Sequence, residues 1–228
     1  MQSFQSILER AAHRHGGEDV IRERFSKPGY DDGVNYGEVP HSDDRWLANF
    51  TMRIFQAGFN WRVIETKWDG FEEAFWGFKV DRCACIDLDD MEKLTSNKAI
   101  VRNPKKIKTV AVNAQMIQSM REEKGSVDNF IRSWPSDDYV GLLDYLQKNG
   151  SHLGAGSASY ALRMGSIPSF VLSRDVTAAL IHAGVIDKPA TGKGARRAVQ
   201  EAFNQWSKES GENLTFISRV LAHSIDAG

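Results

Sequence analysis

The chain has 228 residues, 41% of them hydrophobic and 26% charged, and a formal net charge of −1. This is the composition of an ordinary soluble globular protein, and the near-zero charge argues against a nucleic-acid binder that is basic throughout. No run of 18 apolar residues is present, and two cysteines cannot form a disulfide framework. The first residues also lack the apolar core of a signal peptide, so we expect a cytoplasmic protein with no membrane contact.

The hydrophobic pattern predicts helices along almost the whole chain. In residues 43–58, Trp46, Phe50 and Ile54 recur four apart and form one apolar face, and Ser42 or the aspartates after it can cap the start. Strict alternation is nearly absent, so no substantial β-sheet is expected. The turn-rich segment 26–41 is expected to be an ordered loop. We predict one all-α unit over residues 1–228, with room for two lobes, whose helices comprise residues 43–58, 71–78, 88–95, 104–124, 138–148, 157–164, 175–184, 194–209 and 214–225.

The charge is unevenly distributed along the sequence. Residues 93–108 contain six basic residues and residues 145–174 contain three, and neither stretch contains an acid, whereas residues 81–92 contain five acids. A surface that meets phosphates would exclude carboxylates, because like charges repel. The alternative is an ordinary solvated face. If these stretches bind DNA, the contacts are few and we expect a modest dependence of binding on salt.

Residues 142–176 contain the most informative motif. An apolar helix ends at Gly150 and is followed by a Leu-Gly-Ala-Gly sequence, whose glycines are Gly154 and Gly156, and by a helix that opens at Ser157. Two glycines around a small residue form a tight turn with exposed backbone N–H groups at a helix N-terminus, where a phosphate can bind. By itself, the pattern is more often that of a plain helix–helix turn.

The context of this turn resembles the helix-hairpin-helix motif of the HhH-GPD DNA glycosylase superfamily. After Gly156 come a helix, a loop with Gly and Pro, an apolar run, and Asp175, nineteen positions after Gly156. The superfamily has a catalytic Asp about this far after its second hairpin glycine, although its hairpin proline is absent here. The resemblance implies a catalytic Asp175 and DNA contacts from Gly154, Gly156 and Ser157. The alternative for Asp175 is a plain N-cap of a helix over 176–183.

Two further segments resemble 3-methyladenine DNA glycosylase I, a family of the same superfamily. Residues 55–61 read Phe-Gln-Ala-Gly-Phe-Asn-Trp and resemble its Gln-Gln-Ala-Gly-Leu-Ser-Trp, and residues 99–107 resemble its Gly-Ile-Ile-Arg segment. With the hairpin, the matches span residues 30–185. They imply the helix-hairpin-helix DNA glycosylase fold, with two helical lobes and a cleft, and place the hairpin at about 142–176. Residues 190–228 lie outside the match, as C-terminal helices of unknown role.

The resemblance also assigns residues to a base pocket and to a DNA-contacting surface. Trp61 matches the family's stacking tryptophan, which would hold a cationic base through a cation–π contact, and Gln56 could hydrogen-bond a base edge. The predicted base pocket comprises Trp61, Gln56, Arg53, Tyr30 and Phe59. Beyond the hairpin, DNA contacts are expected from Arg102, Lys105 and Lys106. Tyr160, on the second hairpin helix, is expected in the core.

The chain also departs from the family pattern. Arg53 stands where the family has a pocket Glu, so the resemblance does not carry over the hydrogen bond of that Glu to the base. Ala158 stands where bifunctional members carry a Lys, so a Schiff base with the sugar cannot form there and no lyase activity is expected. Cys83 and Cys85 lie mid-chain and match neither the family's Cys/His zinc site nor a four-Cys iron–sulfur cluster. We expect no metal and no cofactor.

The resemblance thus implies a monomeric, monofunctional DNA glycosylase of base excision repair. It would hydrolyse the N-glycosidic bond of alkylated purines such as 3-methyladenine in double-stranded DNA, in the cytoplasm and on the nucleoid when bound. The damaged base would leave the stack, and Asp175 would stabilise the oxocarbenium-like sugar or accept a proton from water. Three alternatives remain: a non-catalytic helix-hairpin-helix DNA-binding protein, a glycosylase of the same fold for another lesion because Arg53 disfavours a cationic base, and a helical scaffold with no role on DNA.

Overall fold

The computed structural model describes residues 1–26 and 39–226, so Tyr30 and most of the expected loop 26–41 lie outside the described residues. Within these ranges all regular structure is helical, with fourteen α-helices, one 3₁₀ helix and no strand, which confirms the predicted all-α class. No helix in the described part of the chain is long and apolar enough to cross a membrane.

The chain divides into two compact units, each assembled from segments that are distant in sequence. We call the first the terminal unit; it contains the described residues of Met1–Gly37, Pro135–Val140 and Ser166–Gly228. The second, the central unit, contains Gly141–Gly165 and the described residues of Glu38–Trp134. The hairpin predicted from the sequence lies in the central unit, and Asp175 lies in the terminal unit.

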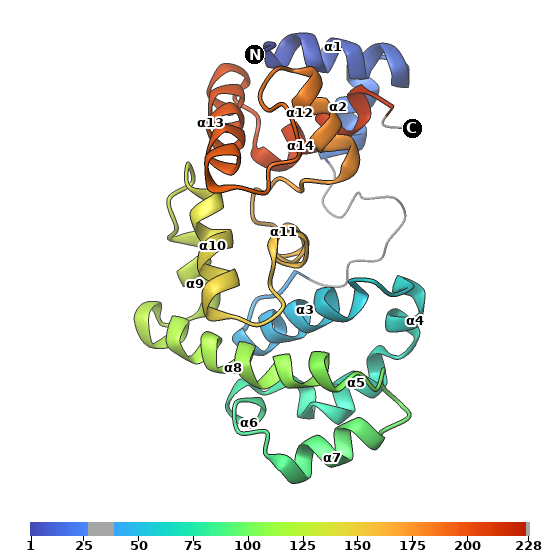
Figure 1. The fold of residues 1–228 in the computed structure, drawn as a ribbon, viewed down its shortest axis with the longest axis vertical. Helices are drawn as coiled ribbons and strands as arrows, with labels where there is room; N and C mark the ends of the chain where they lie inside the picture. Colours follow the sequence, from blue (N-terminus) through green and yellow to red (C-terminus); the bar gives the residue numbers. More distant parts are fainter. Residues whose placement is uncertain (27–38, 227–228) are drawn as a thin grey trace. The chain divides into compact units, whose positions relative to one another are not determined.

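The central unit is built around α3, whose apolar face the sequence predicted. Trp46, Phe50 and Ile54 are all buried, and the Oγ of Ser42 accepts a hydrogen bond from the N–H of Arg45 at the helix start. Figure 1 labels the α-helices of this unit: α3 (Asp43–Gln56), α4 (Trp61–Thr66), α5 (Trp68–Ala74), α6 (Val80–Cys83), α7 (Leu88–Ser96), α8 (Pro104–Lys124), α9 (Val127–Arg132), most of α10 (Tyr139–Asn149), and α11 (Ala155–Met164). The 3₁₀ helix η1 (Trp76–Phe78) follows α5 in the chain.

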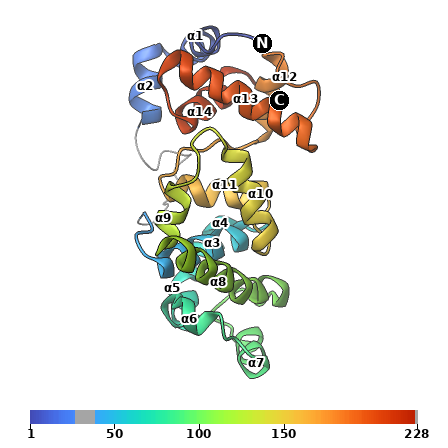
Figure 2. The ribbon, with the colours of Figure 1, turned by 90° about the vertical axis from the view of Figure 1, so that its left-hand side faces the viewer.

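Helix α8 lies beside α3 in both views (Figure 1, Figure 2). It has the predicted boundaries, because Asn103 caps its start, Pro104 occupies the first turn and Gly125 ends it in the left-handed region at φ 81°. On the other side of α3, α11 packs so closely that a Cβ added to Gly165 would lie 2.0 Å from the Trp46 ring. Helix α3 therefore packs against both α8 and α11, and the contact with Gly165 lies near its start.

The helix predicted over residues 71–78 is wrong, because the chain breaks within it. Helix α5 ends at Ala74, and Gly77 has a non-helical φ of 67° inside the 3₁₀ turn that follows. The predicted apolar positions are nonetheless buried: the rings of Phe75 and Phe78 stack with their centroids 5.5 Å apart, and Trp68 stacks on Phe78. Packing of large rings in the core has outweighed the continuous helical spacing.

The terminal unit brings the two ends of the chain into one core. Figure 2 shows its five helices gathered together: α1 (Phe4–His15), α2 (Glu18–Ser26), α12 (Arg174–His182), α13 (Lys193–Ser210) and α14 (Leu214–Ser224). Helix α14 packs against α1 and α12. The guanidinium of Arg219 on α14 donates to the carbonyl of Phe25 at 2.6 Å, and Trp206 is fully buried. The helices at the two ends of the chain, which lie outside the resemblance over residues 30–185, thus form this unit together with α12.

Candidate functional site

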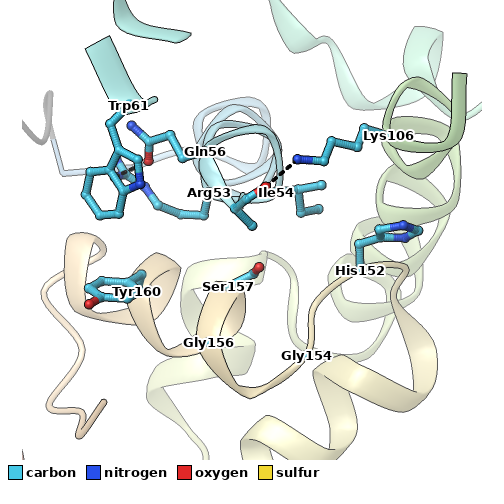
Figure 3. Close-up of a pocket in the computed structure, with 11 residues that line it drawn as sticks. Arg53, Ile54, Gln56, Trp61, Lys106, His152, Gly154, Gly156, Ser157 and Tyr160 are labelled. Atoms are coloured by element: carbon cyan, nitrogen blue, oxygen red, sulfur yellow. Dashed lines mark hydrogen bonds between the residues drawn. The ribbon is translucent and has the colours of Figure 1, made fainter. Parts of the chain in front are cut away.

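A cavity of about 510 Å³ lies within the central unit, between the end of α3 and the hairpin that joins α10 to α11 (Figure 3). Cavities of this size are typical of small-molecule sites. Seven residues predicted from separate segments of the sequence meet around it, and none of the described residues that line it is Asp or Glu. The lining comprises Arg53, Ile54, Gln56, Ala57, Trp61, Lys106, His152, Gly154, Gly156, Ser157 and Tyr160.

Two polar residues of α3 form one wall of the cavity. Arg53 and Gln56 are three apart and share a face of the helix, and their side chains are only 3% and 1% exposed. Arg53 Nη1 donates to Gln56 Oε1 at 2.7 Å, and Arg53 Nη2 lies 3.2 Å from the sulfur of Met52. Although the site was predicted from the resemblance, the contact between these two side chains was not.

Two aromatic residues form the edge of the cavity next to this pair. Trp61 is the first residue of α4, which Asn60 caps, and the guanidinium of Arg53 lies 5.9 Å from the centroid of its ring. The ring of Tyr160 stands perpendicular to that of Trp61 at 5.7 Å. The expectation that Tyr160 lies in the core is therefore wrong. Its position four residues after Gly156, on the same helix face, was the signal that could have placed it here.

Lys106 reaches from α8 to the carboxyl end of α3. Its ammonium donates to the carbonyl oxygens of Phe55, at 3.2 Å, and Ala57, at 2.6 Å, which the end of a helix leaves without intrahelical partners. Burial lowers the pKa of this lysine. The structure thus gives Lys106 a capping role beside the cavity, and its contact with DNA stays a prediction.

The hairpin forms the opposite wall and is held in place by Asn113 of α8. This fully buried side chain accepts from the N–H of Ser151 at 2.7 Å and donates to the carbonyl of Ser151 at 3.2 Å. Gly150 ends α10 where a Cβ would come within 3 Å of Asn113 and of the Leu146 carbonyl. These contacts set the path of the turn that leads to His152 and Gly154.

The two hairpin glycines leave backbone exposed. Gly154 is the N-cap of α11 without a side-chain cap, and Gly156 lies in the first turn, because the helix opens two residues earlier than predicted. A Cβ at Gly154 or Gly156 would meet nothing within 4 Å among the described residues, in contrast to Gly165. The protein's own packing does not require glycine at these two positions, so the bare backbone is free to meet a ligand.

The remaining predicted residues are placed outside the cavity lining. Phe59 is 45% exposed on the turn before α4 and is not among the lining residues. Arg102 and Lys105 are exposed at the start of α8 and form no ion pair with the described residues. Tyr30 lies outside the described residues. Exposed basic side chains of this kind can contact phosphates, whereas Phe59 is not positioned to stack inside the cavity.

Asp175 lies in the terminal unit, as the second residue of α12, and is half-buried. The N-cap of this helix is Ser173, whose Oγ accepts from the N–H of Val176 at 3.2 Å. The alternative that Asp175 merely caps the helix is therefore wrong. Its carboxylate makes no hydrogen bond or ion pair with the described residues, which leaves it available for another partner.

Three further residues, Ala158, Cys83 and Cys85, bear on the lyase and metal chemistry that the sequence argued against. Ala158 is fully buried in α11. Cys83 is buried, its thiol donates to the Phe75 carbonyl at 3.4 Å, and burial raises its pKa to about 12, whereas Cys85 is exposed. The described residues contain no group of three His, Cys, Asp or Glu side chains arranged to hold a metal ion.

Comparison with known proteins gives a family and a fold. The model of the methyladenine glycosylase family matches residues 30–144, which is half of the chain. The 3-methyladenine DNA glycosylase I from Staphylococcus aureus is 22% identical, with 64% of this chain and 90% of that one covered and a TM-score of 0.50. A Methanocaldococcus jannaschii 8-oxoguanine glycosylase/lyase, crystallised with DNA containing 8-oxoguanine, is 12% identical, with 95% of both chains covered and a TM-score of 0.52.

The 8-oxoguanine DNA glycosylase of Thermotoga maritima is similar over the same extent. It is 14% identical, with 96% of this chain and 95% of that one covered and a TM-score of 0.54. At such identities these likenesses show the fold, which is that of helical DNA glycosylases, as predicted. Because the two 8-oxoguanine enzymes cover nearly the whole chain, the helices of the terminal unit, α13 and α14 included, belong to the shared fold.

Proposed function

The chain belongs to the methyladenine glycosylase family, and on that premise we propose that it hydrolyses the N-glycosidic bond of alkylated purines in double-stranded DNA, with 3-methyladenine as the first candidate base. The observation that carries this proposal is the cavity of the central unit, which has the size for a purine and an aromatic edge. A base must leave the duplex before its sugar can react, and such a cavity would receive it.

Each wall of the cavity has a part in the proposed reaction. Trp61 supplies a face on which a flipped base stacks, and Gln56 supplies an amide that meets a base edge. The exposed N–H groups at the start of α11, after Gly154, would hold a DNA phosphate through hydrogen bonds and the helix dipole. Arg102 and Lys105 would add contacts to the phosphate backbone.

We propose Asp175 as the carboxylate that assists the chemical step. As the bond between sugar and base lengthens, C1′ gains positive charge, which a nearby carboxylate stabilises, or the carboxylate accepts a proton from the water that attacks C1′. Its half-buried position without a hydrogen bond or ion pair among the described residues, and the assignment of the capping role to Ser173, support this use. Since Ala158 replaces a lysine, the reaction would end at the abasic site without strand cleavage.

The test is release of base from methylated duplex DNA. The protein is incubated with the duplex, free 3-methyladenine and other methylated purines are measured by chromatography, and abasic sites are counted by strand scission after alkali. We expect free base and abasic sites, with no scission before alkali. No release from any lesion, together with salt-dependent duplex binding, would indicate the non-catalytic DNA-binding alternative.

The role of Asp175 is tested by Asp175→Asn. The substitution keeps the shape but removes the charge, so we expect release to slow by at least a hundredfold with unchanged DNA affinity. Asp187→Asn is the matched control, because Asp187 is an exposed carboxylate that follows the same helix. An Asp175→Asn variant that retains the full rate would show that the hydrolysis proceeds without this carboxylate.

One observation favours a second candidate function. Arg53 is buried at the cavity, at the position of the family's Glu, and its permanent positive charge disfavours a cationic base. A glycosylase of the same fold that acts on a different lesion would not meet this repulsion. The methylated-duplex assay, repeated with other lesions, separates the two candidates.

A further inference from the structure

Gln56 is the most deeply buried polar residue of the cavity lining, and one end of its side chain is unpaired. The amide nitrogen has no hydrogen-bond partner among the described residues, although Gln56 is only 1% exposed. Buried polar groups in proteins are nearly always paired, because leaving one unpaired is unfavourable. Gln56 lines the cavity, so a molecule that fills the cavity can supply the missing partner.

The end of the amide that such a molecule meets is set by Arg53. A glutamine amide has a donor at one end and an acceptor at the other, so an unrestrained amide can turn either end toward a ligand. A guanidinium carries only donors, so the Gln56 atom 2.7 Å from Arg53 Nη1 is the carbonyl oxygen. The nitrogen then lies on the far side of the amide from Arg53 (Figure 3). The opposite orientation would set donor against donor.

Arg53 is itself held in place. It lies three positions before Gln56 on α3, a spacing at which side chains on one face of a helix meet. It is 3% exposed, its Nη2 lies 3.2 Å from the sulfur of Met52, and its guanidinium lies 5.9 Å from the centroid of the Trp61 ring. Because these contacts restrain the guanidinium, the Gln56 oxygen keeps its donor and the amide keeps one orientation.

We infer that Gln56 is a specificity-determining residue that donates to a hydrogen-bond acceptor on the base, and that Arg53 is the positioning residue that restricts the Gln56 amide to this role. A base edge with an N–H at this point would set donor against donor and is disfavoured. The inference rests on the proposed function, because it takes the cavity as the base pocket. It concerns an acceptor atom and not the charge of the base, so it applies to both candidate functions.

The acceptor can be located with bases from which single acceptors are deleted. Adenine has ring-nitrogen acceptors at N1, N3 and N7, and alkylation at N3 leaves N1 and N7. The probes are 9-methyladenine, whose methyl group replaces the sugar, and its 1-deaza, 3-deaza and 7-deaza analogues, in each of which a C–H replaces one acceptor. Isothermal titration calorimetry of the full chain measures their dissociation constants.

We expect one of the three analogues to bind at least about tenfold more weakly than 9-methyladenine, because it leaves the Gln56 donor buried and unpaired. A loss confined to the 3-deaza analogue would support the inference and count against 3-methyladenine, whose N3 is blocked. Equal affinities for all four bases, or no binding of any, would overturn the inference. Release of base from methylated duplex would then still support the proposed function.

The decisive variant is Gln56→Glu. It keeps an oxygen that accepts from Arg53 and places a second oxygen where the N–H was, so it reverses the polarity of the contact. The analogue that binds weakly to the wild type should now bind at least as tightly as 9-methyladenine. The variant forms an ion pair with Arg53 and is expected to fold, which a thermal melt checks. Gln56→Met, of similar size without a donor, should bind both bases equally. A preserved tenfold preference in both variants would overturn the role of Gln56.

Arg53→Lys and Arg53→Met test the positioning role. Lysine keeps a cationic donor and should preserve the preference, whereas methionine lets the amide turn and should lower it at least about threefold. In a ¹⁵N–¹H correlation spectrum, the side-chain amide of Gln56 is assigned from its absence in Gln56→Met. An amide proton of Gln56 should shift downfield when 9-methyladenine binds to the wild type or to Arg53→Lys, and less in Arg53→Met. An unchanged preference and an unchanged shift in Arg53→Met would overturn the positioning role.

Discussion

The two walls of the cavity differ in the chemistry that they present. On the side of α3 and α4, the groups that line the cavity include the polar and aromatic side chains of Arg53, Gln56 and Trp61. On the hairpin side, Gly154 and Gly156 offer bare backbone with nothing in the described protein beside them, next to the side chains of His152, Ser157 and Tyr160. The cavity therefore has a wall of side chains that can distinguish one base from another, and a hairpin wall whose glycine turn offers only backbone, which cannot.

This difference matches the two kinds of information in DNA. Every nucleotide has a phosphate, so contacts from backbone N–H groups position the duplex without reading its sequence, whereas contacts to base edges distinguish bases. Changes in the side-chain wall should alter which base is released and how fast. Changes in the hairpin wall should alter DNA affinity by the same factor for all lesions.

Among changes to the cavity lining, the largest effect is expected from Trp61→Ala in the side-chain wall. Loss of one stacking ring weakens binding of a base by about 1–3 kcal/mol, so we expect base release from a damaged duplex to slow by up to about a hundredfold. Affinity for undamaged duplex should stay within about twofold, since no base is flipped. Single-turnover release and fluorescence anisotropy measure the two quantities.

Phe59→Ala is the matched control for Trp61→Ala. The two aromatic residues are only two positions apart in the sequence, but Phe59 is exposed and does not line the cavity. We expect a clearly smaller loss of release than for Trp61→Ala. Equal losses would contradict the assignment of the stacking role to Trp61 alone.

The longer helices α3, α8, α10, α13 and α14 could be predicted because their signals are local, whereas α1, α2, α4, α6 and α9 were not among the predicted helices. The face of α3 and the boundaries of α8 follow from residues four apart and from a cap, a proline and a glycine at fixed offsets. The break at Gly77 could not be predicted, because it depends on how the ring of Phe78 stacks on Phe75 and on Trp68, which is ten residues away. The spacing of apolar residues along the sequence does not show where these rings pack, and so does not show the break.

The candidate site likewise has features that could be predicted and contacts that could not. The resemblance placed Gln56 and Trp61 in a base pocket and the hairpin glycines at the DNA, and the structure brings them together around one cavity. It did not give the hydrogen bond from Arg53 to Gln56, which depends on rotamers in a packed interior, or the capping role of Lys106, which reaches across 49 residues of sequence to Ala57. Such contacts follow from tertiary packing, which one sequence does not display.

Asn113→Ala tests whether the hairpin wall depends on its support from α8. The substitution removes both hydrogen bonds to Ser151 and leaves a buried backbone N–H and C=O without partners, so we expect a loss of about 2 kcal/mol in the free energy of unfolding. DNA affinity should fall for every lesion alike. Asn149→Ala, which removes an exposed side chain bonded to Tyr145, should cost less than about 0.5 kcal/mol. Urea denaturation measures both, and similar losses would contradict this role of Asn113.

Gly156→Asp tests the hairpin wall directly. A carboxylate at this exposed position would repel a phosphate, so we expect duplex affinity to fall about tenfold, by about 1.4 kcal/mol, with an unchanged ratio between lesions. Gly156→Ala separates charge from bulk: its Cβ meets no described residue, and alanine in place of glycine in a helix should raise stability by about 0.5–1 kcal/mol. An unchanged affinity in Gly156→Asp would place the phosphate elsewhere.

The smallest effects are expected outside the cavity, at the start of α8. Arg102→Gln and Lys105→Gln each remove one exposed cation from a stretch without acids, so each should weaken duplex binding about two- to threefold and lower the slope of log affinity against log salt by about 1. Lys124→Gln removes an exposed cation from the opposite end of the same helix, beside Glu123, and should change neither quantity. Release rates at saturating protein should be unaffected in all three variants, because none of these side chains lines the cavity. Equal salt slopes for Lys105→Gln and Lys124→Gln would show that the acid-free stretch is an ordinary solvated face and that the hairpin alone positions the duplex.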